Sequence, residues 1–132
     1  MAKSNKEHAE QLLKMAVKDH TALSGMLDSR SFSEEVFGFH AQQAVEKALK
    51  AWIAALCLVY PKSHDLSVLV KILKDSGQDL SAFPDLEDYS VFAVQYRYEA
   101  YDDTEEILDR PAIIGATMSL VDHVQGMVAR TA

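Results

Sequence analysis

The stretch that decides the fold of this chain is FHAQQAVEKALKA, residues 39–51. Its alanines, at positions 41, 44, 48 and 51, recur at three- and four-residue steps and so share one face of a helix. Gln43, Lys47 and Lys50 lie on another face, and Glu46 with Lys50 makes a favourable i,i+4 pair. The stretch therefore predicts an α-helix in which a seam of small residues, open to a close neighbour, lies beside a polar stripe.

The helix that contains this stretch is predicted to extend well beyond it on both sides, from Phe32 to about Val59. Ser31, followed three residues later by Glu34, has the spacing of a capping box at its start. Pro61 ends it, because proline cannot continue the helical hydrogen bonds. We therefore expect one long central helix.

The second half of this helix is apolar around most of its circumference, and such a helix must be covered on all sides. In a chain of 132 residues, a second copy could provide part of that cover. The pattern predicts a homodimer whose interface includes Ala48, Trp52 and Leu56.

The same spacing of apolar side chains predicts four more helices. They cover about residues 3–27, 65 or 66–76, 84–96 and 110–128. Gly77 is expected to stop the third helix, and Pro84 and Pro111 fit the first turns of the fourth and fifth. No segment alternates with a period of two. The expected fold is a single all-α domain over residues 1–132, an antiparallel bundle of about five helices.

The composition, 48% hydrophobic and 25% charged, is that of an ordinary globular protein. The nearly uncharged run at 51–61 is only about half of the ~20 residues that a membrane span needs, so no membrane association is expected. No signal-peptide pattern opens the chain, which favours the cytoplasm. The single cysteine, Cys57, excludes an intrachain disulfide and is expected in the core.

The net charge of −7 is concentrated in residues 79–109, which hold ten acids and one base, Arg97. General DNA binding needs a basic surface and is therefore disfavoured. The sequence has no glycine-rich phosphate loop and no spacing typical of metal ligands, so no cofactor or metal is expected. Two short polar clusters remain to be explained, at residues 63–66 and 95–98.

Together these clusters and the central stretch resemble the HEPN family, which is named for nucleotide binding in higher eukaryotes and prokaryotes. The family's second-helix run corresponds to residues 43–51, its H-x-L to residues 64–66, and its R-Y element to Arg97-Tyr98. The resemblance covers about residues 5–128. The implied fold is similar to the C-terminal helical domain of kanamycin-type nucleotidyltransferases.

The resemblance implies a module that dimerises and binds a nucleotide or a partner protein. The expected partner is a minimal nucleotidyltransferase, in a toxin-antitoxin-like pair. The residues expected to bind the nucleotide line one groove: Gln43, Lys47, Lys50, His64, Arg97 and Tyr98.

HEPN ribonucleases need no metal and carry an arginine followed, after four to six residues, by a histidine. Here the corresponding positions after Arg97 are occupied by residues 102–104, which are Asp, Asp and Thr. Because an ordinary aspartate does not exchange protons near neutral pH, a non-catalytic module is favoured. Two alternatives stay open: an endoribonuclease that pairs Arg97 with a spatially close His64 or His40, and a purely structural dimer.

Overall fold

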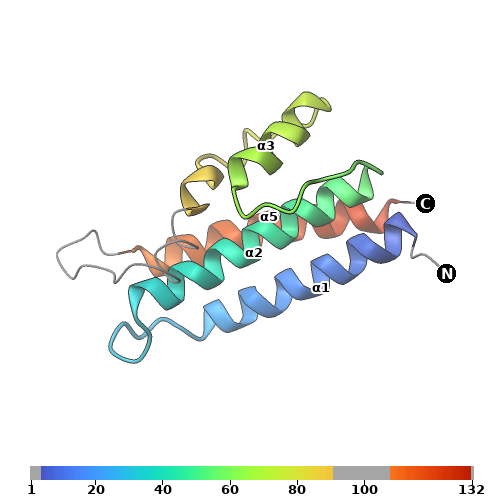
Figure 1. Ribbon diagram of the computed structural model, residues 1–132. Coiled ribbons are helices and arrows are strands. Elements are labelled where there is room, and N and C mark those ends of the chain that lie inside the picture. Colours follow the sequence, from blue (N-terminus) through green and yellow to red (C-terminus); the bar gives the residue numbers. More distant parts are fainter. Residues whose placement is uncertain (1–3, 91–107, 132) are drawn as a thin grey trace.

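The computed structural model describes residues 4–90 and 108–131, which contain four α-helices, one 3-10 turn and no strand. The elements are α1 (Asn5–Ser24), α2 (Glu34–Ala55), α3 (Leu66–Asp75), η1 (Leu86–Tyr89) and α5 (Arg110–Ala129). α2 and α5 run in the same direction and α1 runs opposite to both (Figure 1). The all-α bundle expected from the sequence is confirmed.

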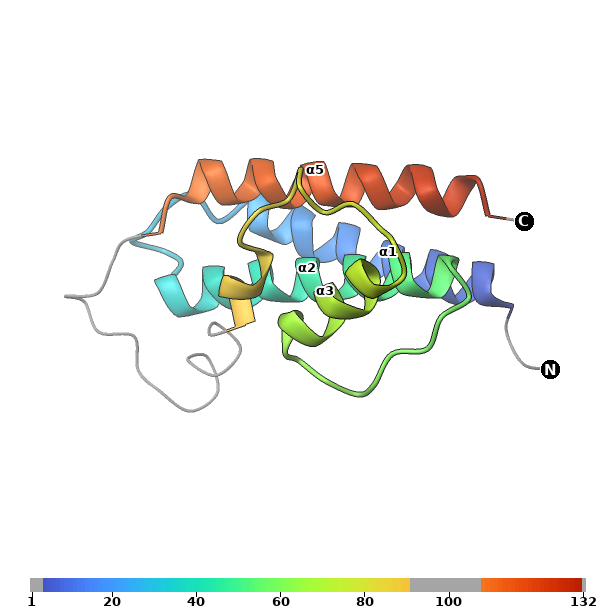
Figure 2. The same ribbon diagram turned by 90° about the horizontal axis from the view of Figure 1, so that it is seen from above.

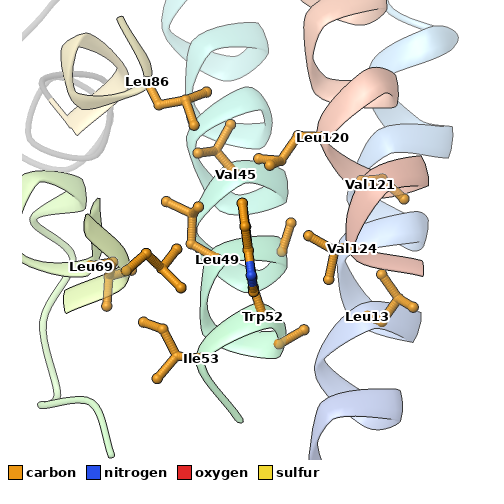
Figure 3. Close-up of a cluster of buried hydrophobic side chains, with 14 of the residues drawn as sticks. Leu13, Val45, Leu49, Trp52, Ile53, Leu69, Leu86, Leu120, Val121 and Val124 are labelled. Carbon is orange, nitrogen blue, oxygen red and sulfur yellow. The ribbon is translucent and has the colours of Figure 1, made fainter. Parts of the chain in front are cut away.

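The three long helices pack on one another, and α3 with η1 covers a further side of α2 (Figure 2). Trp52 lies at the centre of the core, between Leu69 of α3 and Val124 of α5 (Figure 3). Leu13 brings α1 into the same cluster. One chain therefore surrounds the apolar half of α2 with its own helices.

This arrangement corrects the expected dimer interface. The side chains of Ala48 and Trp52 are 0% and 1% exposed within the single chain, and Leu56 packs against the same core. The sequence argument assumed that four short or amphipathic neighbours would leave α2 partly uncovered. Because α1, α3 and α5 cover it completely at Ala48 and Trp52, these two residues are not available to a second copy.

Both ends of α2 differ from the prediction. Ser33 caps its start by accepting a hydrogen bond from the backbone N–H of Val36, whereas Ser31 donates to Asp28 instead of forming a capping box. The helix ends at Ala55, four residues before the predicted end. Cys57 follows with a φ of 61° and is exposed, so its expected place in the core is also wrong.

The end of α2 has a local cause. The backbone N–H of Leu58 donates to the carbonyl of Ile53 at 3.1 Å, which closes the last turn around a left-handed residue, Cys57. Side-chain apolarity continues past this point, so periodicity alone overestimates the length of the helix. Residues 56–65 instead form a strap that crosses back to the start of α3 (Figure 1).

The remaining helix boundaries lie close to the predicted ones, with one exception. Asp65 caps α3, Gly77 follows it with a φ of 89°, and Asp109 caps α5 with Pro111 in its first turn. In the described part of the predicted fourth helix, at 84–96, Leu86–Tyr89 form the short 3-10 turn η1 and Ser90 is helical. Its remainder lies outside the described residues.

Arg110 joins the start of α5 to the start of α2. Its guanidinium is 5% exposed and donates to the carbonyls of Met26 and Phe32 at 2.6 and 2.7 Å and to the carboxylate of Glu34. The other oxygen of Glu34 accepts the backbone N–H of Leu108 at 2.7 Å. This buried ion pair fixes the beginning of α5 against the α1–α2 connection.

Candidate functional site

The candidate site is a row of half-buried polar side chains along α2, which we call the α2 polar stripe. It consists of His40, Gln43, Lys47 and Lys50. The other faces of α2 are occupied by the packing of α1, α3 and α5, so this face alone reaches solvent. The sequence prediction that Gln43, Lys47 and Lys50 share one face is confirmed.

On the α1 side of the stripe, one carboxylate holds two of these residues. Asp19 accepts a hydrogen bond from Lys47 Nζ at 2.7 Å on Oδ2, and its Oδ1 lies 3.2 Å from His40 Nδ1. The Asp19 side chain is only 13% exposed. Lys47 is therefore paired within the chain.

On the α3 side, a second carboxylate does the same. Glu46 Oε2 accepts from Lys50 Nζ at 3.0 Å, which confirms the predicted i,i+4 pair, and Glu46 Oε1 lies 2.9 Å from His64 Nδ1. The Glu46 side chain is 5% exposed, whereas that of His64 is 54% exposed. His64 thus lies at the edge of the stripe and reaches solvent.

Gln42 extends this second group. Its amide nitrogen donates to Glu46 Oε1 at 2.8 Å and to the carbonyl of His64 at 3.3 Å, and its amide oxygen accepts from Gln43 at 2.7 Å. Burial raises the pKa of Glu46, but the hydrogen bonds from Gln42, His64 and Lys50 together lower it more. The net result is a pKa below the usual value, so Glu46 stays ionised.

The strap is fastened to the same group. Lys50 Nζ lies 5.4 Å from the centre of the Tyr60 ring, and the Tyr60 hydroxyl is 2.7 Å from His8 Nε2 on α1. Burial raises the pKa of Tyr60, so its hydroxyl is neutral at physiological pH. Tyr60 therefore fastens the strap to α1 and to Lys50 at a point four residues before His64.

Of the six residues predicted to bind a nucleotide, the structure brings four into this region: Gln43, Lys47, Lys50 and His64. Arg97 and Tyr98 lie outside the described residues. Of the candidate catalytic histidines, His40 and His64 each have Nδ1 facing a carboxylate, which leaves Nε2 as the nitrogen able to accept or release a proton. His40 lies on α2 and faces Asp19 of α1, whereas His64 lies on the strap and faces Glu46 of α2.

Sequence reasoning missed the role of Asp19. It occupies a position on α1 three residues after Ala16 and four before Leu23, both of which are buried. A charged side chain in an otherwise apolar inward stripe is a signal that it meets a partner on the neighbouring helix. Gln42 and Tyr60 were missed as well, because their contacts depend on the path of the strap.

Within residues 4–90 and 108–131, no three His, Cys, Asp or Glu side chains come together as metal ligands would. The stripe itself offers imidazoles, ammonium groups and an amide. Such groups suit an anionic ligand, provided that the internal carboxylates release them.

A small helical bundle with a polar stripe on its central helix defines the class of this protein. The HEPN domain family matches residues 8–112, most of the chain, and the chain belongs to this family. Comparison with curated proteins and with solved structures gives no match.

Proposed function

We propose that this chain is a non-catalytic HEPN-type module that forms a homodimer and binds a nucleotide or a partner protein. The observation that carries the proposal is the outer face of α5. The exposed residues of α5 are mostly small or apolar, with three larger polar ones among them: Pro111, Ala112, Gly115, Ala116, Met118, Ser119, Asp122, His123, Gln125 and Ala129. Asp122 is the one charged residue among them, which is unusual for a helix surface left in water.

The glycine on this face also points to a close neighbour. A Cβ at Gly115 would meet nothing within 4 Å, and its backbone is helical, so nothing in the described chain requires glycine there. A glycine inside a helix costs about 0.5–1 kcal/mol relative to alanine. The close approach of a second backbone would make use of that missing side chain. Exposed Val17 on α1 extends the apolar surface beside α5.

A membrane is the competing explanation for this face. Within the described residues α5 is long and apolar enough to cross a bilayer, with 28% of its most apolar 18-residue window buried. However, Asp122 lies exposed in the second half of the helix, and a carboxylate inside a bilayer is expensive. Leu120 and Val124 would also have to leave the core. A second copy fits these features better.

The test replaces the outer face with charge. Ser119→Arg should convert a dimer into a monomer, because each copy would bring a buried, unpaired guanidinium to the interface. Ser67→Arg is the matched control, since Ser67 is exposed on α3, which packs on α2 and η1. Light scattering on both variants gives the masses. A dimer that Ser119→Arg leaves unchanged would place the interface elsewhere.

The α2 polar stripe is the proposed nucleotide site. Lys47 and Lys50 are already paired with carboxylates, so a phosphate must compete for them, and we expect affinities in the micromolar range or weaker. Phosphate contacts of this kind weaken as salt rises. The outer face of α5 or the stripe would also receive a partner protein, and the family resemblance favours a minimal nucleotidyltransferase, in a toxin-antitoxin-like pair in the cytoplasm.

One observation favours the alternative, a metal-independent endoribonuclease. A carboxylate that faces Nδ1 of His40 or His64 orients the imidazole as a general base would require. The absent arginine-to-histidine spacing argues against it. Cleavage of RNA in the presence of a chelator, lost in Arg97→Ala and in His40→Gln or His64→Gln, would replace the non-catalytic proposal.

A further inference from the structure

The α2 polar stripe contains the same arrangement twice. In each case one carboxylate faces a histidine Nδ1 with one oxygen and accepts from a lysine Nζ with the other. The two groups are His40–Asp19–Lys47 and His64–Glu46–Lys50. They flank the half-exposed face of α2, one from α1 and one from the strap. Because each group contains one histidine, the net charge of the stripe depends on whether the two imidazoles are protonated.

The charge of each group follows from its members. While the imidazole is neutral, the carboxylate cancels the lysine and the group has no net charge. Histidine is the side chain that normally gains its proton between pH 5 and 8. When it does, the group becomes a monocation, and the carboxylate can no longer neutralise both of its partners. The stripe then changes from neutral to a charge of two.

We propose that the α2 polar stripe is an oligophosphate site that its own carboxylates hold closed until His40 and His64 are protonated. This inference rests on the proposed nucleotide binding and specifies how that binding is regulated. With neutral imidazoles, Asp19 and Glu46 compete with phosphate for the two lysines. With imidazolium on both sides, the lysines and histidines together offer a phosphate chain more positive charge than the carboxylates can cancel.

The charged groups around the two histidines support the assignment of Asp19 and Glu46 as the carboxylates that control the stripe. Next to His40, Asp19 comes from α1 and Lys47 from α2, and Lys18 on α1 is exposed. Next to His64, Glu46 and Lys50 come from α2, while the Asp65 carboxylate caps α3 by accepting from the backbone of Ser67.

The turn η1 also packs on α3, where Leu66 N donates to Ser90 Oγ, and it carries Asp85, Glu87 and Asp88. Burial chiefly raises the pKa of Tyr89, and Asp85 and Asp88 raise it further. The charges of Asp85 and Asp88 therefore act on Tyr89, which belongs to η1 as well.

The carboxylates of the two groups differ in how many hydrogen-bond partners hold them. Glu46 is held by three donors, from Gln42, Lys50 and His64, and is nearly inaccessible. Asp19 faces two partners, His40 and Lys47. The Asp19 side should therefore open first, and Asp19→Asn should release Lys47 and His40 even when the imidazole is neutral.

The experiment is a calorimetric titration of ATP and of inorganic tripolyphosphate against the full chain at pH 5.8 and pH 8.0. Wild type should bind about tenfold more tightly at the lower pH, as an added unit charge beside a phosphate implies. Protonation of the terminal phosphate itself works against this trend. At pH 8.0, Asp19→Asn should bind about tenfold more tightly than wild type by the same reasoning.

Two controls separate this effect from overall charge. Asp75→Asn removes the same charge from an exposed pair, in which Lys71 Nζ lies 2.8 Å from Asp75 Oδ2, and should bind as wild type does. The double variant His40→Gln, His64→Gln should lose the gain at pH 5.8 and keep only the opposite trend that protonation of the terminal phosphate causes. Circular dichroism confirms that each variant is folded.

The outcomes are distinguishable. If wild type and the double histidine variant show the same change in affinity between the two pH values, the regulation is overturned and the proposed nucleotide binding stands. An equal gain in Asp75→Asn and Asp19→Asn also overturns the regulation, because it shows a general charge effect. If no protein binds at millimolar ligand at either pH, the proposed nucleotide binding itself fails.

Discussion

Arg110 shows how one residue can organise a bundle without belonging to its apolar core. Its guanidinium satisfies two backbone carbonyls at the α1–α2 connection and the carboxylate of Glu34, and it stacks 4.9 Å from the centre of the Phe37 ring. Buried arginine is rare unless it is fully paired. The sequence placed residue 110 only at the start of a helix, because the partners of Arg110 are about 80 residues away along the chain.

Arg110→Ala should destabilise the fold by about 3–5 kcal/mol, because it leaves Glu34 buried with a broken ion pair and two carbonyls without a donor. Urea unfolding followed by circular dichroism measures the free energy of unfolding. Arg130→Ala is the control, since Arg130 is exposed at the end of α5 and its loss should cost no more than about 0.5 kcal/mol. Equal effects of the two substitutions would contradict the role given to Arg110.

At the scale of elements, the sequence predicted where the long helices lie but not how every helix ends. α3 and α5 begin where the sequence placed them, and their caps, Asp65 and Asp109, directly precede them in sequence. The end of α2 depends on a left-handed conformation at Cys57. Because glycine usually adopts this conformation, the residue type at position 57 did not predict the end of the helix.

The candidate site was predictable to a similar extent. One helix face carries Gln43, Lys47 and Lys50, and helical geometry alone places them together. Glu46, the carboxylate partner of Lys50, is one turn away on the same helix, and this pair was predicted. Asp19, the partner of Lys47, belongs to another helix and was not predicted. The burial of Trp52 depends on how three helices close around it, which periodicity cannot give.

Glu46 links α2 to the strap, and its hydrogen bonds make stability depend on pH. Because the folded-state pKa lies below the ordinary value of 4.5, the ionised form stabilises the fold above that pH. The contribution is lost as pH falls through the folded-state pKa. Wild type should therefore lose stability below about pH 4.5.

Glu46→Gln should lose less stability than wild type over the same acid range, measured by urea unfolding at several pH values. Glu10→Gln, at an exposed position on α1, is the matched control and should follow wild type. A Glu46→Gln profile parallel to that of wild type would show that Glu46 does not control the acid response.

At the scale of the whole molecule, the chain covers its most apolar helix segment with its own elements and leaves a different surface uncovered. Trp52 and Ala48 are inside, whereas the outer face of α5 and the adjacent part of α1 expose apolar and small side chains. The expectation of a dimer remains, but its location moves from α2 to α5. The two proposed activities then use separate surfaces: α5 for association and the α2 polar stripe for anions.

The central claim is that the chain acts by association through α5, and the mass of the wild-type protein in solution tests it most directly. Size-exclusion chromatography with light scattering, run over a range of concentrations, should give a mass near twice 14.7 kDa at high micromolar protein. A mass of 14.7 kDa at every concentration would contradict the account, because the outer face of α5 would then be left in water without a second copy.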